Sequence, residues 1–203
     1  MESSALKYGE YYHIYNRGNN GEALFKEPQN YIYFLTLYAK YINPIADTLA
    51  YCLMSNHFHI AIRIKDKQDI MTFAALEMFQ EGNKIPIENK KPTPSAQFAH
   101  LFNTYSKTIN KSFQRTGSLF EQPFERNVIE TEVYLQRCIA YIHYNPIKAH
   151  LAKSYEDYNW SSFKSLISNK PTHLDRELVM KVFYDKEYFM QFHGSFDGNL
   201  KMP

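Results

Sequence analysis

Two histidines, His57 and His59, lie two residues apart and form the first pattern in the sequence that could bind a metal ion. In a β-strand, positions i and i+2 point to the same face, so both imidazoles would project from one side of the strand. Imidazole nitrogens are common ligands of divalent metal ions, and two of them can form half of a metal site. The alternative interpretation is a pair of half-exposed strand histidines that bind nothing.

A second pair, Tyr141 and Asn145, is spaced four residues apart, which puts both side chains on one face of a helix. A phenol can act as a nucleophile and form a covalent ester, and an amide oxygen can ligate a hard divalent ion. Tyrosine is abundant, with 17 copies, and asparagine before proline commonly ends a helix, so this pair is also compatible with a structural role. Together the two pairs supply the groups needed for metal-assisted phosphoryl transfer through a tyrosine ester.

Basic side chains suited to phosphate contacts recur elsewhere in the chain. Three of them follow one another at intervals of four, which predicts a basic ridge along a helix, although a solvated helix face explains the same spacing. The net charge is only +2, so any nucleic-acid site must be local. The candidate DNA contacts are Lys107, Lys111 and Arg115 on the predicted ridge, together with Arg17 and Arg126.

The elements that must position these residues follow from apolar periodicity and turn residues. Strands are predicted at residues 11–15, 48–54, 57–64 and 124–130. Helices are predicted at residues 27–42, from Ser95 as the cap to the Thr116–Gly117 pair, and at residues 131–145. Pro146 makes Asn145 the expected last residue of the third helix, because the residue before proline avoids the α region. In residues 57–64, apolar side chains alternate with the histidines, so one face of this strand is predicted to pack in the core. The other face, which carries His57 and His59, is then predicted to be available for chemistry.

The order strand, helix, strand, strand, helix, strand is that of the split βαβ motif. The predicted fold class is therefore α+β, with a ferredoxin-like βαββαβ core, an antiparallel sheet, an additional helix and a C-terminal extension. We expect residues 1–152 to form the catalytic domain and residues 153–203 to pack on it or trail from it. Residues 83–94, with three prolines, are interpreted as a loop, and residues 174–183 in the tail 173–203 show some helical periodicity.

Two isolated cysteines, Cys52 and Cys138, stand in apolar surroundings without a C-x-x-C spacing, so we expect both to be buried and reduced. The first twenty residues hold no apolar signal region, and no stretch approaches 18 uncharged apolar residues. The expected location is therefore the cytoplasm, with association to the nucleoid when the protein is bound to DNA, and no membrane partner.

Five blocks of the sequence resemble the single-tyrosine HUH transposases, and within them the REP-associated tyrosine transposases. They are YHIYNRG at 12–18, LMSNHFHI at 53–60, GSLF at 117–120, YIHYNPIKA at 141–149 and YNWSSF at 158–163, in the family's order. The last block, around Trp160, is what favours the REP-associated branch.

This resemblance implies a DNA transposase or nickase that cleaves single-stranded DNA beside a hairpin through a 5′-phosphotyrosine intermediate. It implies that His57 and His59 bind a divalent ion, Mg²⁺ or Mn²⁺, that Asn145 completes the metal site, and that Tyr141 is the nucleophile. The implied partner is single-stranded DNA with a palindromic hairpin, bound by a monomer or by a homodimer that exchanges its tyrosine helix. Two other functions remain open, a non-catalytic binder of structured single-stranded nucleic acid and a metal phosphodiesterase that uses water.

Overall fold

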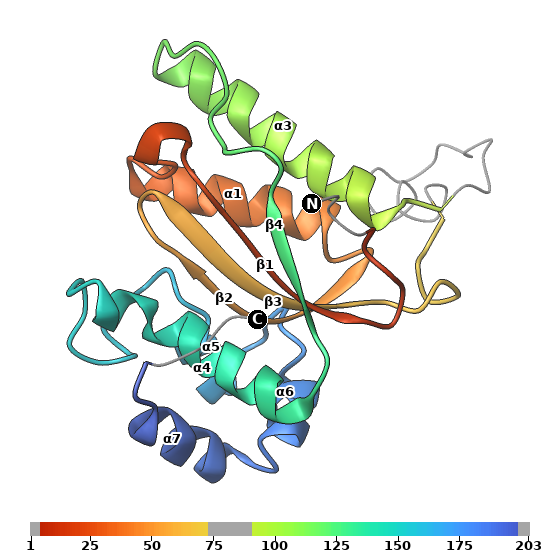
Figure 1. The fold of residues 1–203 in the computed structure, drawn as a ribbon, viewed down its shortest axis with the longest axis vertical. Coiled ribbons are helices and arrows are strands. Elements are labelled where there is room, and N and C mark those ends of the chain that lie inside the picture. The colour runs from red at the N-terminus through yellow and green to blue at the C-terminus, as the bar shows by residue number, and fades with distance from the viewer. Residues whose placement is uncertain (1–4, 73–90, 199–203) are drawn as a thin grey trace.

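The computed structural model describes residues 5–72 and 91–198. Its centre is an antiparallel four-stranded sheet in the order β2-β3-β1-β4, built from β1 (Tyr11–Arg17), β2 (Ala46–Leu53), β3 (His57–Ile64) and β4 (Glu125–Ile129). Helices α1 (Pro28–Tyr41) and α3 (Pro94–Ser112) cover one face, and α4 (Glu132–Lys148) covers the other (Figure 1). This is the predicted ferredoxin-like βαββαβ core followed by an additional helix, so the fold class is confirmed.

The chain beyond α4 forms three short helices on the α4 side of the sheet (Figure 1): α5 (Phe163–Ile167), α6 (Arg176–Val182) and α7 (Lys186–Ser195). The helical periodicity predicted at residues 174–183 is thus confirmed by α6. Before α5, the chain runs along the edge strand β2, where the backbone N–H of Leu53 donates to the Trp160 carbonyl at 2.9 Å. The extension therefore packs on the sheet edge and on α4, and the division at residue 152 stays a prediction.

Both faces of the sheet are buried, which corrects the expectation of one core face and one chemical face. On β3, Phe58 and Ile60 lie in the core beneath α1 and α3. On the opposite face His59 is only 8% exposed and Ala61 is fully buried, because α4 packs against them with a second apolar core. At the end of this face nearest the predicted site, His57 is half-buried.

Helix α3 begins and ends differently from the prediction. Pro94 occupies its first turn after the extended residue Thr93, so Ser95 lies inside the helix and is not its cap. The helix ends at Ser112, and Gln114 then adopts a left-handed conformation with φ 51°. The predicted continuation of the helix to residue 115 is therefore wrong.

Helix α4 continues past the proline that was expected to stop it. Thr131 caps its start as predicted, since its side chain accepts a hydrogen bond from the Tyr134 N–H. Pro146 lacks the N–H that would bond to the Ile142 carbonyl. The Asn145 side chain compensates in part, because its Nδ2 donates to the Tyr141 carbonyl at 2.8 Å and approaches the Ile142 carbonyl at 3.5 Å. The helix therefore extends to Lys148 rather than ending at Asn145.

The remaining expectations about the chain as a whole concern the cysteines, the membrane and the proline-rich loop. Cys52 and Cys138 are both free and buried, as predicted. Within the described ranges, no helix combines the length and apolarity that crossing a bilayer requires. Residues 83–90 of the predicted loop lie outside the described residues.

Candidate active site

The imidazoles of β3 and the phenol of α4 meet on one side of the sheet. In the strand register, Tyr15 of β1 lies opposite His59, and Arg17 lies opposite His57. The ring of Tyr141 packs edge-on against His59, with 5.6 Å between the ring centroids and 76° between the planes. A single chain therefore brings the predicted nucleophile to one of the predicted metal ligands.

Each of the two predicted metal ligands has its Nδ1 occupied by a neighbour. The Nδ1 of His57 lies 2.7 Å from Oδ1 of Asn56, and since an amide oxygen only accepts, His57 carries its proton on Nδ1. The Nδ1 of His59 lies 3.0 Å from Nε2 of His13. Histidines that bind metals typically have one ring nitrogen held in this way by a neighbour, which leaves the other for the ion.

Both imidazoles are held in the neutral form that metal binding requires. Burial lowers the pKa of His57, and the nearby charge of Arg17 lowers it further. Burial also lowers the pKa of His59 well below its usual value, with smaller contributions from His13, His57 and Lys148. Because neutral imidazole is the ligand, these residues fit a divalent cation at neutral pH.

The predicted third protein ligand is an amide. Among the described residues, no group of three or more His, Cys, Asp or Glu side chains could hold a metal ion. Asn145 is buried one turn beyond Tyr141, and its Nδ2 is committed to the helix backbone. Its Oδ1 is then the atom left for coordination, and the metal role of Asn145 stays a prediction.

An open polar cleft of about 670 Å³ lies beside the imidazoles. Arg17 lines it and forms an ion pair with Glu121, with 2.7 Å between Nε and Oε1, while 65% of the arginine side chain is exposed. Of the predicted DNA contacts, Arg17 is the one that lies in this cleft. A phosphate entering here would meet both the guanidinium and the carboxylate that now neutralises it.

Two residues that sequence reasoning did not assign also lie at the site. Tyr15 lines the cleft, and its ring centroid lies 5.7 Å from that of His59, almost the separation found for Tyr141. Lys148, exposed at the end of α4, has its Nζ 5.8 Å from the centroid of the Tyr141 ring. The signal for Lys148 was its spacing of seven residues from Tyr141, which is informative only if the helix passes Pro146.

The other predicted DNA contacts are elsewhere. Lys107 and Lys111 are exposed on α3, across the sheet from α4 (Figure 1). Arg126 pairs with the core residue Ile14 in the strand register, so it belongs to the α3 face as well, where its guanidinium lies 4.6 Å from the centroid of the Phe124 ring.

Arg115 does not extend the predicted basic ridge, because α3 ends at Ser112. Its Nε donates to Oε2 of Glu22 at 2.8 Å, and its Nη1 donates to Oδ1 of Asn110 at 2.6 Å. The predicted continuous ridge of three basic side chains on one helix is therefore wrong. DNA contacts by Lys107, Lys111, Arg115 and Arg126 stay predictions.

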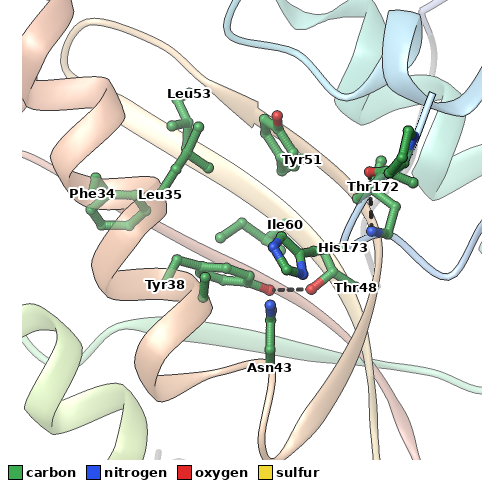
Figure 2. Close-up of a pocket in the computed structure, with 13 residues that line it drawn as sticks. Phe34, Leu35, Tyr38, Asn43, Thr48, Tyr51, Leu53, Ile60, Thr172 and His173 are labelled. Carbon is green, nitrogen blue, oxygen red and sulfur yellow. Dashed lines mark hydrogen bonds between the residues drawn. The ribbon is translucent and has the colours of Figure 1, made fainter. Parts of the chain in front are cut away.

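A second cavity, of about 280 Å³, lies on the opposite face of the sheet between α1, β2 and residues 171–174 (Figure 2). Its walls are mainly apolar, and the hydroxyls of Tyr38 and Thr48 hydrogen-bond across 2.8 Å at its side. Its β3 residue is Ile60, whose side chain points away from the face that carries His59. This cavity is therefore separate from the histidine site.

A buried chain of hydrogen bonds ties the tyrosine helix to the C-terminal extension. The Nδ1 of His143 on α4 lies 2.9 Å from Nε2 of His193 on α7, and its Nε2 lies 2.8 Å from Oγ of Ser162. The Nδ1 of His193 donates to the Phe189 carbonyl at 2.8 Å. These contacts join α4 to α7 and to Ser162, which is itself hydrogen-bonded to Tyr51 of β2. Sequence reasoning left both histidines unassigned.

No protein-family model matches the sequence, and no curated protein matches it. Among solved structures, the chain is similar to a REP-associated tyrosine transposase bound to a REP hairpin, with a TM-score of 0.58. The likeness covers 84% of this chain and 87% of that chain, at 12% sequence identity. Since so low an identity carries the fold and no more, the comparison establishes that this chain has the fold of that transposase.

Proposed function

We propose that this chain is a transposase-type enzyme that cleaves and rejoins hairpin-bearing single-stranded DNA through a covalent bond to Tyr141. The observation that carries this proposal is the contact between the Tyr141 and His59 rings, 5.6 Å apart between centroids, beside an open polar cleft. The fold likeness to a transposase bound to a DNA hairpin supports DNA as the partner. The sequence blocks around these same residues support the same reaction.

The cleavage step is an in-line displacement at phosphorus. The Tyr141 oxygen attacks the phosphate, the new P–O bond to tyrosine forms, and the bond to the 3′ oxygen breaks. Burial raises the pKa of Tyr141, so the phenol is protonated at rest and must lose its proton during attack, while the departing 3′ oxygen gains one. The ammonium of Lys148, 5.8 Å from the ring centroid, is placed to stabilise the negative charge that develops on the phenol oxygen and the phosphate.

The protein's own contribution to metal binding is a pair of neutral imidazoles and one amide oxygen. His57, His59 and Asn145 would hold the ion, with Mn²⁺ favoured by the imidazole ligands and Mg²⁺ by its availability. A divalent ion bound there supplies charge neutralisation at the phosphate and fixes its orientation. Arg17, once released from Glu121, adds a bidentate contact to the DNA backbone.

The tyrosine ester distinguishes this reaction from hydrolysis. A phosphotyrosine bond keeps the free energy of the phosphodiester that was broken, so a second 3′-hydroxyl can attack it and release Tyr141. Strand transfer then needs no ATP. A phosphodiesterase that uses water, by contrast, leaves no covalent intermediate.

The test is a nicking assay with end-labelled single-stranded oligonucleotides that carry a fixed hairpin and randomised flanks, in Mn²⁺. We expect a protein–DNA adduct that survives denaturation, is lost in Tyr141→Phe and persists in Tyr15→Phe. The second variant is the matched control, because Tyr15 lies equally close to His59. Cleavage without an adduct would favour the water-using phosphodiesterase, and binding without cleavage would favour the non-catalytic binder.

A further inference from the structure

His13 lies directly behind the proposed metal ligand His59. It is fully buried on β1, and its Nε2 lies 3.0 Å from Nδ1 of His59. The two rings are also packed together, with 5.1 Å between their centroids. His13 does not line the cleft, and its ring also packs against those of Tyr15 and Tyr141, with 5.0 and 6.2 Å between centroids.

One hydrogen bond between two neutral imidazoles holds one proton, and two arrangements are possible. In the first, His13 donates from Nε2, and His59 then carries its own proton on Nε2, where it blocks coordination. In the second, His59 donates from Nδ1, and its Nε2 presents a lone pair to the cleft. Only the second arrangement can ligate a cation.

The surroundings of His13 indicate which of the two arrangements is favoured. Its Nδ1 is buried and has no hydrogen-bond partner in the described part of the chain. In the first arrangement this atom is an unpaired acceptor, and in the second it is an unpaired N–H donor. Because buried donors without an acceptor are rarer in proteins than under-satisfied acceptors, the first arrangement is expected when no cation is bound.

We propose that His13 is a positioning residue that sets whether Nε2 of His59 carries a proton or a lone pair, and that it switches from donor to acceptor when a divalent cation binds. The proton count is unchanged: His59 loses a proton from Nε2 to solvent, the shared proton passes from His13 to His59, and His13 gains a solvent proton on Nδ1. This inference rests on the metal role of His59 in the proposed function.

The first test measures Mn²⁺ affinity of the full chain by calorimetry without DNA. His13→Leu removes the hydrogen bond and should weaken Mn²⁺ binding about 10- to 100-fold, as losing such an outer partner does elsewhere. His13→Gln, whose side chain can still accept from His59, should bind much more nearly as the wild type does. His100→Gln, at an exposed position on α3, is the control and should leave affinity unchanged.

His59→Ala separates failure of this inference from failure of the metal site. If His59→Ala abolishes Mn²⁺ binding while His13→Leu binds like the wild type, the role of His13 is refuted and the metal site stands. If the wild type binds no Mn²⁺, or His59→Ala binds as well as the wild type, the metal site itself is refuted together with the inference.

The second test needs no variant and so does not depend on whether His13→Leu folds. Nitrogen-15 NMR of the wild type reports which ring nitrogen of His59 carries the proton, with and without Zn²⁺ as a diamagnetic probe. We expect protonated Nε2 without the ion and protonated Nδ1 with it. The same protonated nitrogen in both states would overturn the proposal.

Discussion

Acid should destabilise this protein through the buried histidine pair that anchors the tyrosine helix. His193 is only 2% exposed and lies in a cluster of aromatic rings, 4.1 Å from Phe189 between centroids. Burial lowers its pKa to about 4, against a smaller opposing effect of its hydrogen bond to the Phe189 carbonyl. The perturbation we propose is His193→Gln, which removes the titrating group and keeps a side chain able to donate and accept.

The sign follows from comparing the folded and unfolded chains. Unfolded, His193 takes up a proton near pH 6.5, whereas the folded protein resists protonation down to about pH 4. Between these values the unfolded state binds more protons, so the free energy of unfolding falls as the pH falls. At about 1.36 kcal/mol per pH unit, the full interval corresponds to about 3 kcal/mol, of which about 1 kcal/mol is already lost at pH 5.5.

The assay is urea denaturation at pH 7.5, 6.5 and 5.5, followed by the fluorescence of Trp160, the single tryptophan of the chain. Trp160 stacks on Tyr31 with 4.3 Å between centroids, so its emission reports loss of packing. Between pH 7.5 and 5.5, wild type should lose about 1 kcal/mol more than His193→Gln. Equal losses in wild type and His193→Gln would refute the reasoning.

Three further predictions concern charge and helix capping at the site. Lys148→Met should slow adduct formation in single-turnover assays about 10-fold or more, with most of the rate kept in Lys148→Arg, because the cation stabilises charge developing beside Tyr141; equal rates in Lys148→Met and wild type would remove that role. Glu121→Gln should strengthen binding of single-stranded DNA in fluorescence anisotropy, because it frees Arg17 from its ion pair, and weaker binding would contradict this. Thr131→Ala should lower the free energy of unfolding by about 1 kcal/mol in urea titrations, because the N-terminus of α4 loses its cap; unchanged stability would show that the cap contributes nothing.

The elements predicted most successfully are those with local signals. The alternation of residues 57–64 predicts a strand, and β3 has these bounds. The apolar spacing in residues 27–42 predicts a helix, and α1 lies within that range. Turn residues mark where each element ends, and the resulting order of strands and helices is that of the ferredoxin-like core. The contact between Tyr141 and His59 was anticipated from residue types and from the resemblance, and its geometry needed the fold.

Several of the failures depend on contacts between distant segments. Which face Arg126 occupies is set by its register against Ile14, and Arg115, beyond the end of α3, pairs with Glu22 of a distant segment. Where α4 continues past Pro146, the Asn145 side chain donates to the Tyr141 carbonyl, a local contact that a rule for proline alone does not include. Sequence reasoning left His13 unassigned, because only the strand pairing places it behind His59.

The most direct test of the central claim is to map the residue that becomes bonded to DNA. Wild-type protein incubated with the hairpin oligonucleotides and Mn²⁺ is digested, and the peptide that carries a nucleotide through its phosphate is sequenced by mass spectrometry. We predict the modification on Tyr141, the phenol that α4 holds edge-on to His59. A modification on Tyr15, or oligonucleotides cleaved with every tyrosine unmodified, would contradict the account.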